Sequence, residues 1–103
     1  MKHINQRGVT LTLQEVYVMT RKARAVYNVC REFDLPGNVR ASVRALQTSL
    51  SYLCDAMEEE DKQAAEKHLN EARARFEMAL KTISNTDHKG LQFLTLLLTK
   101  IEA

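Results

Sequence analysis

Apolar side chains in the middle of this chain recur in steps of four and three residues, a rhythm that strongly limits the folds available to it. The first series is Val39, Val43, Leu46, Leu50, Leu53 and Met57, and the second is Ala65, Leu69, Ala72, Phe76, Ala79 and Ile83. Residues at these spacings lie on one face of an α-helix. The pattern predicts two amphipathic helices packed in a helical bundle.

A turn is expected between these two segments, because their apolar series are out of phase. A helix continuing from Met57 would bring Asp61 to the core side, but the second series restarts at Ala65. Asp61 is a good N-cap residue, and the acidic residues before it suit the positive end of a helix dipole. We therefore predict a tight helical hairpin at residues 58–61. One continuous helix is the alternative, since neither Gly nor Pro interrupts residues 38–89.

An earlier helix is predicted from its capping residues. Thr12 and Glu15 have the spacing of a capping box, which satisfies two backbone N–H groups at a helix start. Pro36 and Gly37 end the segment. The apolar or small residues at helical spacing, assigned to the core, are Leu13, Val16, Tyr17, Thr20, Ala23, Val26, Tyr27, Cys30 and Phe33.

A fourth helix is predicted from Asp87 to Ile101. Its main apolar stripe is Leu91, Leu94, Leu97, Leu98 and Ile101. Phe93 and Leu96 fall outside that stripe, so the helix is apolar around much of its circumference. Such a helix needs cover on more than one side, which favours self-association of the chain.

Length and composition fit one such bundle. A chain of 103 residues suits a single domain, and a hydrophobic content of 45% supports a packed core. We predict an all-α, antiparallel up-down four-helix bundle over residues 11–103, oligomeric, preceded by a flexible segment over residues 1–10. No apolar run reaches the roughly 18 residues that cross a bilayer, and the polar start lacks a signal-peptide stretch. The expected location is therefore cytoplasmic.

Motifs that carry enzymatic chemistry are missing from the sequence. There is no glycine-rich phosphate loop, no Cys-x-x-Cys and no His-Glu-x-x-His. His3, His68 and His88 share no metal-ligand spacing. Cys30 and Cys54 fall on different helices at different distances from the bend between them, so we expect two separate, reduced core thiols. The prediction is a protein that is not an enzyme and uses no metal or other cofactor.

Charge is unevenly distributed along the chain. Residues 1–50 carry eight basic and three acidic side chains, a net +5, whereas residues 51–103 carry seven basic and ten acidic ones, a net −3. The run Glu58-Glu59-Glu60-Asp61 does not converge on one cation, because consecutive helical residues point about 100° apart. We interpret that run as a solvated turn.

Five arginines in the first half form the main candidate site. Arg21, Arg24 and Arg31 share one face of the first helix, and Arg40 and Arg44 are one turn apart on the second. If the two helices are neighbours, these side chains form a continuous basic surface. A guanidinium group donates two hydrogen bonds to phosphate, so the surface predicts nucleic-acid binding without sequence readout. The alternative is that these arginines only solubilise the helix surface.

The junctions between the predicted helices carry recognisable landmarks. The segment Phe33-Asp34-Leu35-Pro36-Gly37-Asn38-Val39-Arg40 contains an apolar-Pro-x-x-x-Arg junction, and Asp61-Lys62 and Leu69-Asn70-Glu71-Ala72 lead to Phe76. In these landmarks the chain resembles a four-helix-bundle family, the accessory variability proteins of diversity-generating retroelements and the bundle proteins encoded in ribosomal-RNA intervening sequences. The resemblance implies a ring-shaped homo-oligomer, commonly a pentamer, that binds a reverse transcriptase and its template RNA. Of the five arginines, Arg40 alone matches the family's junction.

Together these features predict a non-enzymatic accessory protein that binds a reverse transcriptase and structured RNA through its basic helical surface. The alternative is an adaptor or inhibitor of the phage or plasmid type, which binds a protein partner through its acidic or apolar helix faces. The acidic stretch from Asp55 to Asp61 is the feature behind that alternative. Neither prediction involves a membrane.

Overall fold

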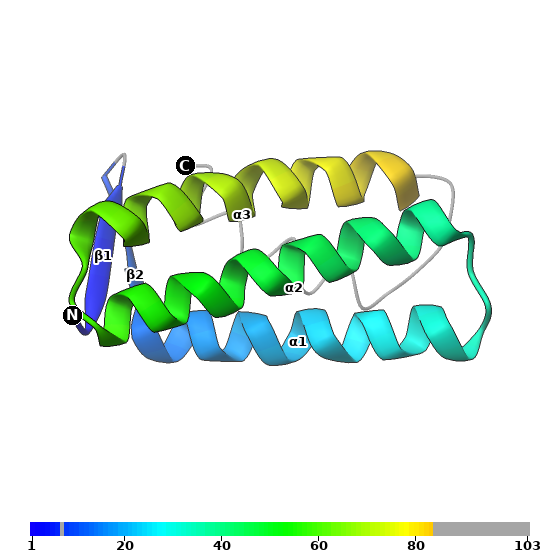
Figure 1. Cartoon of the computed structure of the whole chain (residues 1–103), viewed down its shortest axis with the longest axis horizontal. Coiled ribbons are helices and arrows are strands. Elements are labelled where there is room, and N and C mark those ends of the chain that lie inside the picture. Colours follow the sequence, from blue (N-terminus) through cyan, green and yellow to red (C-terminus); the bar gives the residue numbers. More distant parts are fainter. Residues whose placement is uncertain (7, 84–103) are drawn as a thin grey trace.

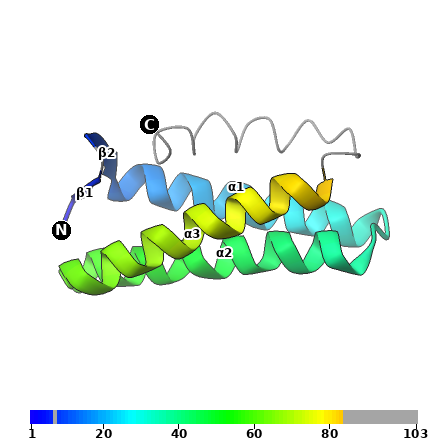
Figure 2. The same cartoon turned by 90° about the horizontal axis from the view of Figure 1, so that it is seen from above.

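A computed structural model describes residues 1–6 and 8–83, which form a short β-hairpin followed by three long helices (Figure 1). The elements are β1 (His3–Gln6), β2 (Val9–Thr12), α1 (Leu13–Glu32), α2 (Gly37–Glu58) and α3 (Lys62–Ile83). Successive helices run in opposite directions, and α2 packs against both α1 and α3 (Figures 1 and 2). The hairpin lies at the end of the bundle where α1 and α3 begin (Figure 1).

The capping box predicted for α1 is confirmed. The Thr12 hydroxyl accepts a hydrogen bond from the Glu15 N–H at 3.1 Å, and the Glu15 carboxylate accepts one from the Thr12 N–H at 3.2 Å. At the other end, Asp34 adopts a positive φ of 50°, and the Leu35 N–H donates to the Cys30 carbonyl at 3.0 Å. This Schellman-type bond closes α1 just before Pro36.

The tight hairpin predicted between α2 and α3 is also confirmed. Glu60 adopts a φ of 59°, which reverses the chain, and the Asp61 N–H donates to the Ala56 carbonyl at 3.0 Å. The Asp61 carboxylate then accepts the Ala64 N–H at 3.1 Å and caps α3. The turn restarts the helical phase, so Met57 and Ala65 both face the core.

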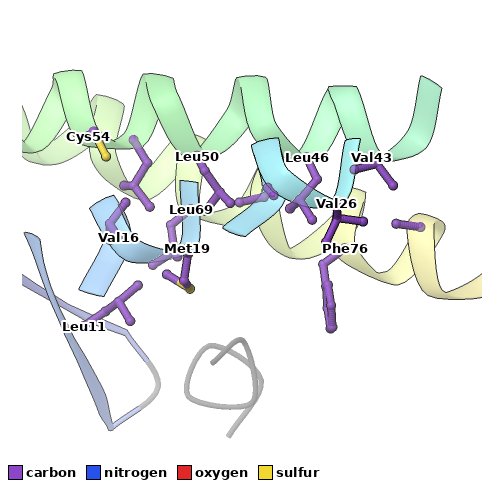
Figure 3. Close-up of a cluster of buried hydrophobic side chains, with 14 of the residues drawn as sticks. Leu11, Val16, Met19, Val26, Val43, Leu46, Leu50, Cys54, Leu69 and Phe76 are labelled. Carbon is purple, nitrogen blue, oxygen red and sulfur yellow. The ribbon is translucent and has the colours of Figure 1, made fainter. Parts of the chain in front are cut away.

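The core is built from the two predicted apolar series and one face of α1. Phe33 was assigned to this face but is 71% exposed, whereas Met19, which was not assigned to it, is fully buried. All of the first series is buried, and so are the members of the second from Ala65 to Ala79. Side chains from all three helices meet in one cluster, including Met19, Leu50 and Phe76 (Figure 3). The residues that α1 contributes are Val16, Met19, Ala23, Val26 and Cys30.

Both cysteines are buried free thiols, as the sequence predicted. Burial raises the pKa of the Cys30 and Cys54 thiols. They therefore remain protonated near neutral pH and act as small core side chains.

The flexible segment predicted over residues 1–10 differs from the structure, in which this part of the chain forms the β-hairpin. Ile4 and Leu11 pair across the two strands, and both are buried against the bundle. Gly8 supplies a positive φ of 78° at the turn. This hairpin has little signature in the sequence, because two isolated apolar residues gain burial only once the helices are in place.

The described chain is thus mostly helical, with one short antiparallel sheet. The predicted fourth helix lies outside the described residues, and so does the apolar surface behind the prediction of self-association. Among the described helices, none contains a stretch long and apolar enough to cross a membrane.

Candidate nucleic-acid interface

Three of the five predicted arginines line one groove between α1 and α2. The groove has a volume of 390 Å³, and its arginines are Arg24, Arg31 and Arg44. We call it the basic groove. Its other lining residues are Tyr27, Asn28, Gln47, Thr48, Ser51 and Tyr52.

Helical spacing explains why these side chains meet. On α1 the lining residues lie three, four and seven positions after Arg24. On α2 they lie three, four, seven and eight positions after Arg44, so each set falls on one face of its helix. Each stripe lies beside the buried stripe of its own helix. Because the two helices pack together, the stripes form the two walls of one groove.

The side chains that line the basic groove carry a net positive charge. Of the described residues that line it, none is acidic. The guanidinium groups of Arg24 and Arg31 form no ion pair or hydrogen bond within the described part of the chain. A concave surface with charge of one sign concentrates ions of the opposite sign. The groove is therefore suited to an anion.

Arg44 is held by a tyrosine of the opposite helix. Its guanidinium carbon lies 5.3 Å from the centre of the Tyr27 ring, and Nη1 donates a hydrogen bond to the Tyr27 hydroxyl at 3.4 Å. Tyr27 was assigned to the core from its spacing, and it does pack against the core while half-buried. The same ring also contributes to the groove wall, a role that spacing alone did not reveal.

Tyr52 is a second aromatic residue of the groove, and the sequence analysis missed it. Its side chain is 52% exposed. Its ring centre lies 5.4 Å from that of His68 on α3, and His68 Nδ1 lies 3.2 Å from Glu71 Oε2. The sequence signal for this residue was an aromatic side chain that lies between Leu50 and Leu53 but outside the apolar series that they belong to.

Arg21 lies in different surroundings. It lines a second hollow of 340 Å³ between α1 and α2, shared with Arg24 and bounded by Asp55 and Glu58. We call this the mixed groove. Two carboxylates there offset the positive charge, so the five arginines do not form one uniform basic surface.

A tyrosine in the mixed groove pairs with one of these carboxylates. The Tyr17 hydroxyl donates a hydrogen bond to Glu58 Oε1. This bond, together with desolvation and the negative charge of Glu58, raises the pKa of Tyr17 to about 12. Tyr17 was assigned to the core, but its side chain is 36% exposed.

Arg40, the arginine that matches the family junction, is absent from the described lining of both grooves. It is half-buried near the start of α2, close enough to Cys30 for its charge to act on that thiol. Its Nε atom is buried and has no hydrogen-bond partner among the described residues. Arg40 and Arg44 are therefore one helical turn apart on α2 but lie in different environments.

Most of the acidic run at residues 58–61 has a partner within the protein. Glu58 accepts from Tyr17, Glu60 lies 3.6 Å from the amino group of Met1, and Asp61 caps α3. Across the part of the chain that the structure describes, no cluster of His, Cys, Asp and Glu has the arrangement to hold a metal ion.

No protein-family model, curated protein or solved structure matches this chain. The resemblance to the retroelement accessory and intervening-sequence proteins therefore stays a prediction.

Proposed function

We propose that this chain is a non-enzymatic RNA-binding module that holds the sugar-phosphate backbone in its basic groove. The observation that carries the proposal is the convergence of Arg24, Arg31 and Arg44 on a groove whose described lining contains no carboxylate. Guanidinium groups pair well with phosphate oxygens, because their planar fork donates two parallel bonds. Contacts of this kind give binding that depends on salt and not on base sequence.

The partner proposed from the family resemblance is a reverse transcriptase, with the chain assembled as a ring-shaped homo-oligomer. In this proposal the basic groove supplies the RNA contact and another surface meets the enzyme. The adaptor alternative relies on the acidic stretch from Asp55 to Asp61. Within that stretch Glu58 and Asp61 already accept hydrogen bonds from the chain, and Glu60 lies 3.6 Å from the amino group of Met1, so part of its hydrogen-bonding capacity is used internally.

Fluorescence anisotropy with a labelled RNA hairpin, repeated over a salt series, tests the RNA-binding proposal. We expect R24A/R31A to weaken binding by about tenfold or more, since each hydrogen bond to a charged group contributes about 1.5–3 kcal/mol. The matched control is R21A/R75A, which removes the same charge from two exposed positions, one in the mixed groove and one on α3.

The comparison of these two variants decides the proposal. If both weaken binding equally, then binding follows net charge and the basic groove is not the site. Circular dichroism of both variants checks that the helices are retained, which we expect because all four side chains are exposed.

A further inference from the structure

We propose that the basic groove accepts an unpaired nucleotide, with its base stacked on the Tyr52 ring and the adjoining phosphates on Arg24 and Arg31. The site then prefers single-stranded RNA to a duplex. This inference rests on the proposed function and specifies its ligand.

Tyr52 has the position of a stacking platform. The residue is 52% exposed, and it lines a groove whose other walls are arginines, polar side chains and Tyr27. His68 lies against it at a tilt of 40°, and His68 is itself positioned by Glu71. The ring is thus supported from α3 while it lines the groove. Aromatic rings in positively charged grooves stack with bases of any sequence.

Tyr27 has a different role in the same groove. The guanidinium of Arg44 already lies over its ring, at 5.3 Å from the centre. Tyr27 therefore orients an arginine, whereas Tyr52 remains available to a ligand. The two tyrosines therefore have different roles in one groove.

Two amide side chains supply hydrogen-bonding groups in the same groove. Asn28 and Gln47 line the groove from opposite helices, and their amides have no partner within the described residues. An amide both donates and accepts, which matches the exposed edge of an unpaired base. In a duplex these base edges are already paired, and the bases are stacked on one another.

The length of the groove also fits a short single strand. Arg24 and Arg31 are seven residues apart on α1, a distance of about 10 Å along the helix axis. Carboxylates bound the groove at both ends, with Asp55 and Glu58 in the mixed groove and Glu32 beside the next hollow along α1. Three arginines imply at most three phosphate contacts, which give a salt slope of about −2 for a single strand.

The test compares an unstructured 5′-labelled oligouridylate with a blunt RNA duplex of about the same length, by anisotropy over a salt series. We expect the single strand to bind at least about tenfold more tightly. Y52L should weaken single-strand binding by about tenfold and leave the salt slope unchanged, because stacking is lost while the phosphate contacts remain. Y52F should bind like the original chain, since the ring is kept.

Y17L is the matched control, because it removes an exposed tyrosine from the mixed groove. Equal binding of strand and duplex, or equal losses for Y52L and Y17L, overturns the single-strand inference. If R24A/R31A still weakens binding in that case, the RNA-binding function stands and only the base platform is wrong. If R24A/R31A has no effect, the proposed function itself fails, and with it the inference that rests on it.

Discussion

The basic groove and the mixed groove lie along the same seam between α1 and α2, and they share Arg24 and Ser51. They differ in what α2 contributes. Near its start α2 adds Arg44 and polar side chains, whereas near its end it adds Asp55 and Glu58. The net charge of each groove therefore depends on α2, while α1 supplies arginine to both.

This difference shows why a count of arginines overestimates a binding surface. An antiparallel partner brings different charges to successive turns of the same helix. Arg21 and Arg24 are only one turn apart on α1, yet Arg24 reaches a groove free of described carboxylates and Arg21 does not.

The largest effect is expected from Leu50→Ala, which removes a fully buried side chain from the helix that both grooves share. Loss of the transfer free energy and the resulting cavity should lower the free energy of unfolding by about 2–5 kcal/mol. Urea denaturation measures this change. Met78→Ala is the control, since its side chain is 53% exposed and the change should stay within about 0.5 kcal/mol. Equal losses for both variants would mean that the core faces are assigned wrongly.

Gln47→Glu should make the basic groove resemble the mixed one. A carboxylate beside Arg44 offsets its charge and repels phosphate, so we expect RNA binding to weaken by about tenfold, or about 1.4 kcal/mol. Anisotropy at low salt measures the change. Gln63→Glu adds the same charge at an exposed position of α3 and should have a smaller effect. Identical effects would show that the groove has no special role.

Asp55→Asn is the reverse experiment. Removing one carboxylate from the mixed groove lowers its repulsion of phosphate, so Arg21 should then contact RNA, tightening binding about threefold and steepening the salt slope by up to about 0.7. Glu77→Gln, an exposed position on α3, is the control for net charge. An unchanged slope for Asp55→Asn would indicate that Arg21 lies out of reach of the bound strand.

The smallest effect concerns Tyr17, whose pKa is raised from its ordinary value of 10.0 to about 12 by its hydrogen bond to Glu58. Glu58→Gln should lower the pKa of Tyr17 toward that ordinary value, which a titration of tyrosinate absorbance measures. Because the pKa is raised in the folded state, the contribution to stability is complete below pH 10 and is lost as pH rises through about 12. A Tyr17 titration unchanged in Glu58→Gln would contradict this pairing.

Local signals in the sequence predicted the helices well. These signals are the Thr12–Glu15 pair, Pro36, and the phase shift before Ala65. Each acts on neighbouring backbone groups, so a short stretch of sequence is enough to predict its effect. Helical spacing also places Arg24 and Arg31 on one face of α1, and both line the basic groove. The same spacing grouped Arg21 with them, but Arg21 lines the mixed groove.

The rest depends on how the helices face one another, which the sequence does not specify locally. Whether an arginine of α1 meets Arg44 or Asp55 is decided by the alignment of the two helices. Tyr52 became part of the site only because α1 and His68 of α3 lie beside it. The N-terminal hairpin was missed for a similar reason, since its burial requires the finished bundle.

The N-terminal β-hairpin is hydrogen-bonded to α3, which is distant from it in the sequence. Gln6 donates a hydrogen bond to Asn70 at 3.0 Å and accepts one from Arg73 at 2.6 Å, a contact between residues 67 positions apart. Closing so long a loop is entropically costly, whereas pairing α1 with α2 needs only a short connection. We therefore expect the α1–α2 pair, and the basic groove with it, to form early in folding, and the contacts that hold the hairpin to form only once α3 has docked.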